Sequence, residues 1–301
     1  MAAYNEAVTA KRPAPAGVML SVLSGYQQSD DFRQLAARTR ADYVKQIKKI
    51  EAEFIDFPLA ALDDRRTRAI FLEWRDRMAL QSRRQADYAW SVLARVLSWA
   101  HDRGLVVANP CTRGGRLYRG SRAENVWTPD DEAQFLKQAP AHLRLAFMLA
   151  LWTGQRQGDL LALPWSAYDG EKIRLRQQKT GTRVVIPVGA PLKKLLDTTE
   201  RRSPIVLVTL EGKPWTPDGF RVSWRKAVAR AGITGLTFND LRGTAVTRLA
   251  LAGCTEAQIA TLTGHSLRDA RSILDANYLA RDPALAESAI RKLETRTKLP
   301  D

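Results

Sequence analysis

A segment rich in glycine and arginine divides this chain of 301 residues into two parts with different sequence patterns. Residues 109–127 contain Gly114, Gly115 and Gly120 among several arginines, and they show no apolar periodicity. Glycine-rich sequence of this kind is typical of loops rather than of helices or strands. Because the parts on either side are long enough to bury a core each, we expect two domains joined by a basic linker at residues 109–127.

The part before the linker has the periodicity of amphipathic helices. Residues 39–54 place apolar side chains on one face (Tyr43, Ile47, Ile50 and Phe54), with lysines on the other. The same period predicts helices at residues 64–78 and 84–103, the second ended by Gly104. We therefore expect residues 31–108 to form a small helical domain.

The two ends of the chain are expected to lie outside the domains. Residues 1–30 mix Ala, Pro, Gly and Ser, which predicts a flexible arm with one short helix at residues 18–23. Residues 283–296 have amphipathic spacing, which predicts a helix in a C-terminal tail at residues 283–301.

The part after the linker combines helix and strand patterns. Thr128-Pro129-Asp130 is typical of a helix start. Two alternating segments flank a turn with Gly181, which predicts a β-hairpin of residues 172–177 and 183–188. The other predicted elements are helices at 143–151, 190–201, 220–231, 239–251, 255–263 and 269–279 and a short strand at 204–209. The fold class is thus mainly α with a small β-sheet, and residues 128–282 form a mixed α+β domain.

Composition limits the classes of function. Lys and Arg number 47 against 32 Asp and Glu, a net charge of +15 that favours a polyanionic partner such as nucleic acid. Two cysteines and three histidines are too few for a disulfide framework or a familiar zinc site, so we expect no metal. No apolar run reaches membrane-span length and no signal peptide is evident, so we expect a cytoplasmic protein without a membrane partner.

Basic side chains gather in three places that suit contact with DNA phosphates: the first long helix, the linker and the helix at 220–231. The candidates are Lys45, Lys48, Lys49, Arg113, Arg116, Arg119, Arg122, Arg221 and Arg225. The alternative is an ordinary solvated surface, and for the linker the two interpretations are compatible.

Five side chains suit chemistry on a phosphodiester. Arg156 and Arg242 offer forks of donors that fit phosphate oxygens. His265 can donate or exchange a proton near neutral pH, and Tyr278 carries a hydroxyl that can attack phosphorus. Lys179 stands at the hairpin turn. Three of them have a plainer interpretation as well. Arg156 could form an ion pair with its near neighbour in sequence, Asp159. Lys179 could be an ordinary exposed turn lysine, and Tyr278 a core tyrosine.

In this order the motifs resemble those of the tyrosine recombinases, the phage integrases. The chain has Thr153-Gly154-Gln155-Arg156-Gln157-Gly158-Asp159 followed by Leu160, Leu161, Leu163 and Trp165, then Lys179, Asn239-Asp240-Leu241-Arg242, Gly264-His265 and Tyr278. The resemblance spans roughly residues 128–282. It departs from the family at Asn239, where the family has histidine, and in a longer spacing between His265 and Tyr278.

The resemblance implies a core-DNA-binding domain at 31–108, a catalytic domain of the recombinase type at 128–282 and a site without cofactor. Tyr278 would be the nucleophile that forms a 3′-phosphotyrosyl bond, and Lys179 the acid for the leaving 5′-oxygen. The implied catalytic set is Arg156, Lys179, Asn239, Arg242, His265 and Tyr278. The implied partners are double-stranded DNA, copies of the chain in a tetramer on DNA with a monomer in solution, and an accessory DNA-bending protein.

Integration or excision of a mobile element, in the nucleoid of a bacterium or from a phage, is the function that this resemblance implies. Two other functions stay open at this point. One is a DNA-binding protein without catalysis that uses residues 253–264 as part of a helix-turn-helix. The other is an enzyme similar to type IB topoisomerases, which nicks and reseals one duplex.

Overall fold

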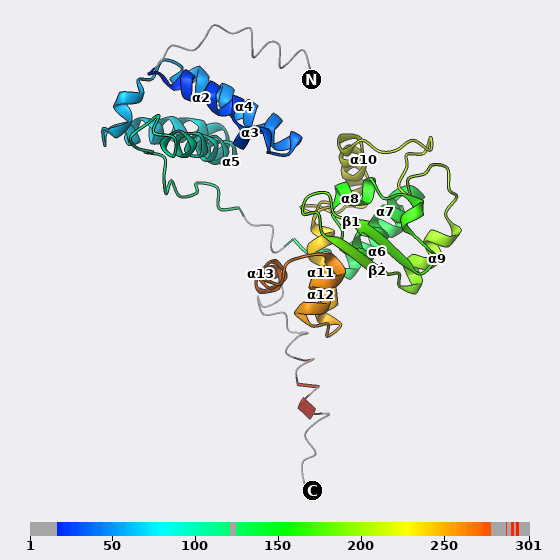
Figure 1. The fold of residues 1–301 in the computed structure, drawn as a ribbon. Helices are drawn as coiled ribbons and strands as arrows, with labels where there is room; N and C mark the ends of the chain where they lie inside the picture. The colour runs from blue at the N-terminus through cyan, green and yellow to red at the C-terminus, as the bar shows by residue number, and fades with distance from the viewer. Residues whose placement is uncertain (1–16, 121–124, 278–286, 288–289, 292, 295–301) are drawn as a thin grey trace. The chain divides into compact units, whose positions relative to one another are not determined.

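The computed structural model of the chain describes residues 17–120, 125–277, 287, 290–291 and 293–294. It divides into two compact units, residues 1–120 and 121–301 (Figure 1). The described residues are mostly helical with one two-stranded sheet, so the predicted fold class is confirmed. No helix within these ranges has the length and apolarity that a membrane crossing needs.

The first unit is entirely helical in its described part. Its elements are α2 (Met19–Gln28), α3 (Asp30–Arg33), α4 (Ala37–Phe54), the 3₁₀ helix η1 (Leu59–Asp63) and α5 (Thr67–His101). Helix α5 is interrupted at Ser82, whose φ of −161° and ψ of 105° are not helical. The interruption separates the two helices that the sequence predicts at 64–78 and 84–103.

Helix α2 confirms the helix predicted at residues 18–23 and extends it to Gln28, but the helix belongs to the core of the first unit rather than to a flexible arm at residues 1–30. Met19, Val22, Leu23 and Tyr26 are each at most 1% exposed and belong to one core with α4 and α5. These residues recur at the spacing of one helix face, and burial of that apolar stripe outweighs the entropy of ordering the segment. Residues 1–16 lie outside the described part of the chain.

The predicted linker is bound to the first unit over much of its length. Arg68 donates to the carbonyls of Pro110 (2.5 Å) and Thr112 (2.7 Å). The Asp87 carboxylate accepts the N–H groups of Leu117 (3.1 Å) and Tyr118 (2.9 Å). Side chains of helix α5 therefore provide hydrogen-bond partners for the backbone of residues 110–118, a segment that composition alone predicts to be a solvent-exposed linker.

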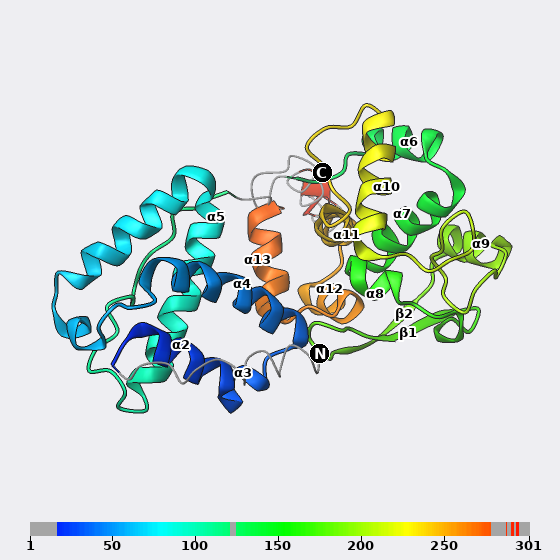
Figure 2. The same ribbon diagram turned by 90° about the horizontal axis from the view of Figure 1, so that it is seen from above.

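The second unit consists of helices and one β-hairpin in its described part. Its elements are α6 (Pro129–Gln138), α7 (Ala141–Thr153), α8 (Gln157–Leu161), the 3₁₀ helix η2 (Trp165–Ala167), β1 (Lys172–Arg176), β2 (Arg183–Pro187), α9 (Ala190–Thr198), α10 (Pro217–Arg230), α11 (Asp240–Leu251), α12 (Glu256–Thr263) and α13 (Leu267–Asn277). Thr128 and Asp131 form the capping box that starts α6. Helices α11, α12 and α13 pack together, and α12 also meets β2 (Figure 2).

An aromatic cluster fills the core of this unit. Trp127, Phe135, Phe147 and Trp224 are at most 3% exposed, and the Phe135 and Trp224 rings lie 4.5 Å apart between centroids. The strand predicted at residues 204–209 is not formed. Ile205 and Val208 make only isolated bridges, to Pro164 and Pro214, because this segment has no continuous partner strand.

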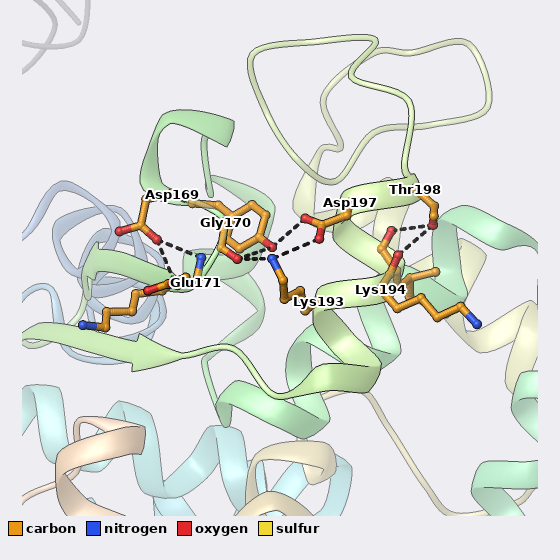
Figure 3. Close-up of polar contacts among 10 residues, drawn as sticks. Asp169, Gly170, Glu171, Lys193, Lys194, Asp197 and Thr198 are labelled. Carbon is orange, nitrogen blue, oxygen red and sulfur yellow. Dashed lines mark hydrogen bonds and ion pairs between the residues drawn. The ribbon is translucent and has the colours of Figure 1, made fainter.

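The base of the hairpin is fixed by contacts with α9. The Tyr168 hydroxyl donates to Asp197 of α9 (2.7 Å), and Lys193 forms an ion pair with the same carboxylate (3.1 Å; Figure 3). Asp169 accepts the N–H groups of Glu171 and Lys172 at the start of β1. Strands β1 and β2 pair antiparallel from Lys172–Pro187 to Arg176–Arg183. The turn at the other end contains Gly181 at φ +72° and presents Lys179.

Replacing Asp87 with alanine should expose residues 117–120 to proteolysis, because two backbone N–H groups lose a charged acceptor. The loss of about 1–3 kcal/mol of local stability predicts at least about fivefold faster trypsin cleavage after Arg116 and Arg119. Cleavage rates followed by mass spectrometry test this, with Glu73→Ala, an exposed carboxylate of the same helix, as the control. Equal rates in the two variants would contradict the contact.

Candidate active site

Arg156 stands at a sharp turn between two helices. Helix α7 ends at Thr153, Gly154 takes the left-handed conformation at φ +62°, and Arg156 is the N-cap of α8. A Cβ on Gly154 would lie 2.8 Å from the Thr263 methyl group, so the turn requires glycine for space as well as conformation. The following apolar residues are buried and fix the turn: Leu160, Leu161, Leu163 and Trp165.

Arg242 lies in the first turn of α11 and is tied to two other elements. Its Nη1 donates to the carbonyls of Gly154 and Thr263 (3.0 Å to the latter), and its Nε donates to His265 Nε2 (3.0 Å). Burial, followed by the nearby charge of Arg156, lowers the pKa of Arg242 to about 9. Its Nη2 is buried without a hydrogen-bond partner among the described residues. A guanidinium in this state has a donor ready for an anion.

His265 is arranged as a neutral acceptor. The Thr263 hydroxyl gives its proton to the Ile259 carbonyl (2.7 Å), so its lone pair accepts from His265 Nδ1 (2.7 Å). The Nε2 atom then carries the lone pair that Arg242 uses. Burial, followed by the charges of Arg242 and Arg156, lowers the pKa of His265 to about 4. Donation from Nε2 to a phosphate, the predicted role, therefore requires a further proton on the ring.

Two glutamines that sequence reasoning missed complete this site. Gln177 donates to Gln155 Oε1 (2.7 Å) and to the Thr263 carbonyl (2.8 Å), and its Oε1 accepts from Arg156 Nη1 (2.9 Å). Gln155 and Gln177 are at most 1% exposed. The available signal was the strand pattern: Ile173, Leu175 and Gln177 alternate onto one face, and a glutamine on an inward face needs buried partners.

The remaining predicted catalytic residues are not part of this buried network. Lys179 is exposed at the hairpin turn, and Asn239 is exposed just before α11, without a side-chain cap. Tyr278 lies outside the described residues, immediately after α13. Asp159 accepts the N–H of Gln178 (2.8 Å), and no ion pair joins it to Arg156 among the described residues. The plainer interpretation of Arg156 is thus wrong.

The candidate DNA-contacting residues are mostly exposed where the structure describes them. This holds for Lys45, Lys48, Arg113, Arg116, Arg119, Arg221 and Arg225. Lys49 is half-buried and donates to Gln46 (3.1 Å) and Gln85 (3.0 Å), and Arg221 pairs with Asp218. Arg122 lies outside the described residues. Exposure permits phosphate contact at these positions, and the contacts themselves stay predictions.

The donor set of the site suits an anion. The two guanidiniums supply N–H donors and positive charge, whereas a divalent cation requires carboxylate or several neutral ligands. Within the described ranges no three His, Cys, Asp or Glu side chains come together as ligands. The chemistry that fits Arg156, Arg242 and His265 is therefore recognition of a phosphate and stabilisation of charge on its oxygens.

The protonation of His265 gives a direct test. Because its pKa is lowered, the folded protein should keep the ring neutral down to about pH 4, while the unfolded chain takes up a proton near 6.5. The contribution of His265 to the free energy of unfolding should therefore be constant above pH 6.5 and fall as the pH drops from 6.5 towards 4. NMR titration of the imidazole signals, assigned with His265→Gln, checks the first point. A midpoint at or above 6.5 in the free protein would contradict the network.

Comparison with known proteins follows this geometry. The model of the phage integrase family matches residues 126–278, half of the chain. The integrase of Escherichia phage HK022 is 26% identical over 236 residues, which cover 73% of this chain and 65% of that protein. The integrase of Mycobacterium phage L5 is 24% identical, with 69% and 63% covered. The chain thus spans somewhat less than two thirds of the length of these relatives.

Solved structures give the same fold. A lambda integrase dimer bound to a COC′ core site has a TM-score of 0.74 at 21% identity, covering 94% of this chain and 82% of that one. A lambda integrase tetramer bound to a Holliday junction has a TM-score of 0.72 at 21% identity, covering 88% and 85%. Arg156, Arg242 and His265, which the structure brings together, all lie within the matched residues. The chain belongs to the phage integrase family.

Proposed function

We propose that this chain is a site-specific DNA recombinase that cleaves and rejoins DNA through a 3′-phosphotyrosyl intermediate. The observation that carries the proposal is the half-buried Arg242, whose buried Nη2 has no partner among the described residues and whose Nε donates to a neutral His265. Arg156 adds a second positive charge beside it. Such a pair is suited to a phosphodiester, and membership of the phage integrase family supports DNA as the source of that phosphate.

The first chemical step exchanges one phosphodiester for another. The Tyr278 hydroxyl gives up its proton to solvent, and its oxygen attacks the scissile phosphorus and forms the phosphotyrosyl bond while the bond to the 5′-oxygen breaks. Lys179 gives a proton to that leaving oxygen, and Arg156 and Arg242 stabilise the non-bridging oxygens. The reverse attack by the 5′-hydroxyl of a partner strand releases Tyr278 and joins the exchanged strands. Since the bond energy is kept throughout, the reaction requires no nucleotide cofactor.

Strand exchange between two duplexes requires four nucleophiles, so we propose a tetramer on DNA assembled from monomers. Lambda integrase has been solved as a dimer on a core site and as a tetramer on a Holliday junction, which supports this assembly. An accessory DNA-bending protein completes the proposed complex. The substrate would be the DNA of a bacterial nucleoid or a phage, with the helical first unit and residues 109–127 contacting phosphates.

Covalent trapping tests the nucleophile. Duplexes selected from a random library for binding to the protein would be nicked at successive positions, so that cleavage beside a nick releases a short strand and leaves the protein attached. Wild type should form a covalent product that survives denaturation, and Tyr278→Phe should form none. Tyr168→Phe, which removes another tyrosine hydroxyl of the same unit, serves as the control.

The outcomes of this test separate the alternatives. Specific binding without covalent product in wild type would leave a DNA-binding protein without catalysis. Covalent product on a single duplex with relaxation of supercoils, and without strand exchange between two sites, would indicate a nicking and closing enzyme similar to type IB topoisomerases. Covalent product with exchange between two duplexes supports the recombinase.

Asn239 offers a second test, because an amide can bind a phosphate but cannot carry a proton. We expect Asn239→His to raise the single-turnover cleavage rate by up to about 10²-fold at neutral pH, since it adds a group for proton transfer. Asn239→Ala should lower the rate. A histidine variant no faster than wild type at any pH between 6 and 8 would show that the exposed position lies away from the reacting phosphate.

A further inference from the structure

One buried side chain connects parts of the site that lie far apart in sequence. Gln177 is 0% exposed, and its amide uses all of its hydrogen-bonding capacity. The nitrogen donates to Gln155 Oε1 (2.7 Å) and the Thr263 carbonyl (2.8 Å). The oxygen accepts from Arg156 Nη1 (2.9 Å) and Thr180 Oγ1 (2.9 Å). A flipped amide would direct its N–H groups at the guanidinium, so these partners fix its orientation.

Each partner belongs to a different part of the proposed chemistry. Arg156 is one of the two guanidiniums, and Thr180 directly follows Lys179 at the hairpin turn. The Thr263 carbonyl precedes Gly264-His265 and also accepts from Arg242 Nη1 (3.0 Å). The backbone of Gln177 closes the hairpin turn, donating to Thr182 (2.8 Å) and accepting from Gly181 (2.8 Å). Gln177 contacts Arg156 and Thr180 directly, and it shares the Thr263 carbonyl with Arg242. A displacement of its amide would therefore move both guanidiniums and the turn that carries Lys179.

The position requires a neutral amide. A carboxylate would retain the acceptor for Arg156, but it would pair with the guanidinium and compete with a phosphate for its charge. A carboxylate also has no N–H group, so Gln155 Oε1 and the Thr263 carbonyl would each lose the hydrogen bond that Gln177 donates. An apolar side chain of the same length would leave Arg156 Nη1 without its acceptor. A Cβ on Gly264 would lie 2.5 Å from Gln177 Nε2, so the glycine permits this close approach.

We propose that Gln177 is a positioning residue that sets Arg156 and the hairpin carrying Lys179 in register for the same phosphate. This inference rests on the proposed function, because it assigns a role within that reaction. Gln177 touches neither substrate nor reacting atoms in this account. It acts through its contacts with Arg156 and Thr180.

Single-turnover cleavage of the trapped duplex tests the proposal with Gln177→Met, which keeps the length and removes the amide. We expect the rate to fall about 10- to 100-fold, the loss that a small misplacement of catalytic groups produces. The dissociation constant for DNA should change less than threefold. Thr199→Val, which loses a hydrogen bond to the Leu195 carbonyl (2.6 Å) at the end of α9, is the matched control for stability and should cleave at the wild-type rate.

A second substrate separates positioning from general loss of structure. Replacing the leaving 5′-oxygen with sulfur yields a thiol leaving group, with a pKa near that of cysteine at about 8.5, which departs without a proton from Lys179. The defect of Gln177→Met should shrink on this substrate by at least about threefold and not vanish, because the share due to Arg156 remains. Lys179→Ala should recover almost fully and Arg156→Ala should not recover.

Gln177→Glu supplies the test of charge. It should cleave at least as slowly as Gln177→Met, although it keeps an acceptor for Arg156. Cleavage by either variant within twofold of wild type would overturn the proposal, as would a Gln177→Met defect of the same size on both substrates. Absence of covalent product in wild type itself would overturn the proposed function, and this inference with it. Product in wild type with unaffected Gln177 variants would overturn the inference alone.

Discussion

The second unit depends on one unusual arrangement, in which two like-charged guanidiniums are stabilised by neutral acceptors. Arg156 binds the Gln177 amide, and Arg242 binds two backbone carbonyls and the neutral ring of His265. Burial and mutual repulsion lower the pKa of Arg242, which shows that the site opposes its own charge. Carboxylate partners would relieve that strain and cancel the charge, whereas neutral acceptors hold the guanidiniums and leave the charge for a phosphate.

The backbone around this pair follows from the same requirement. Helices α7 and α12 end at Gly154 and Gly264, both with positive φ, and Arg242 donates to carbonyls at these two ends. The carbonyl end of a helix carries partial negative charge, so two such ends stabilise a cation without an acid. Each glycine also lies against a side chain, Thr263 or Gln177, where a Cβ would be too close. Glycine is thus required at both turns for two reasons: it adopts the positive φ, and it leaves room for α12 to pack closely against α7 and the hairpin.

These particulars explain how far the sequence could lead. Periodicity predicts α4, the hairpin and α11, and the order of motif residues predicts that Arg156, Arg242 and His265 meet, as they do. The strand pattern indicates that Gln177 is buried, but the partners of Gln155 and Gln177 were missed because several of these bonds join positions 21 to 108 residues apart. Composition missed the burial of α2 and the anchoring of residues 110–118 for a related reason. Their order comes from contacts with α5 that a window of sequence does not contain.

The site also separates charge stabilisation from proton transfer. The guanidiniums are half-buried, whereas Lys179 and Asn239 are exposed in the described structure. Since Asn239 cannot carry a proton, proton transfer in the proposed reaction would fall to Lys179 and His265. His265 has a pKa of about 4 because burial and two positive charges disfavour its protonated form. A bound phosphodiester would bring a negative charge against the same ring and offset those charges. In the proposed reaction, phosphate binding would then convert His265 from an acceptor for Arg242 into a donor, while Lys179 keeps the role of acid for the leaving oxygen.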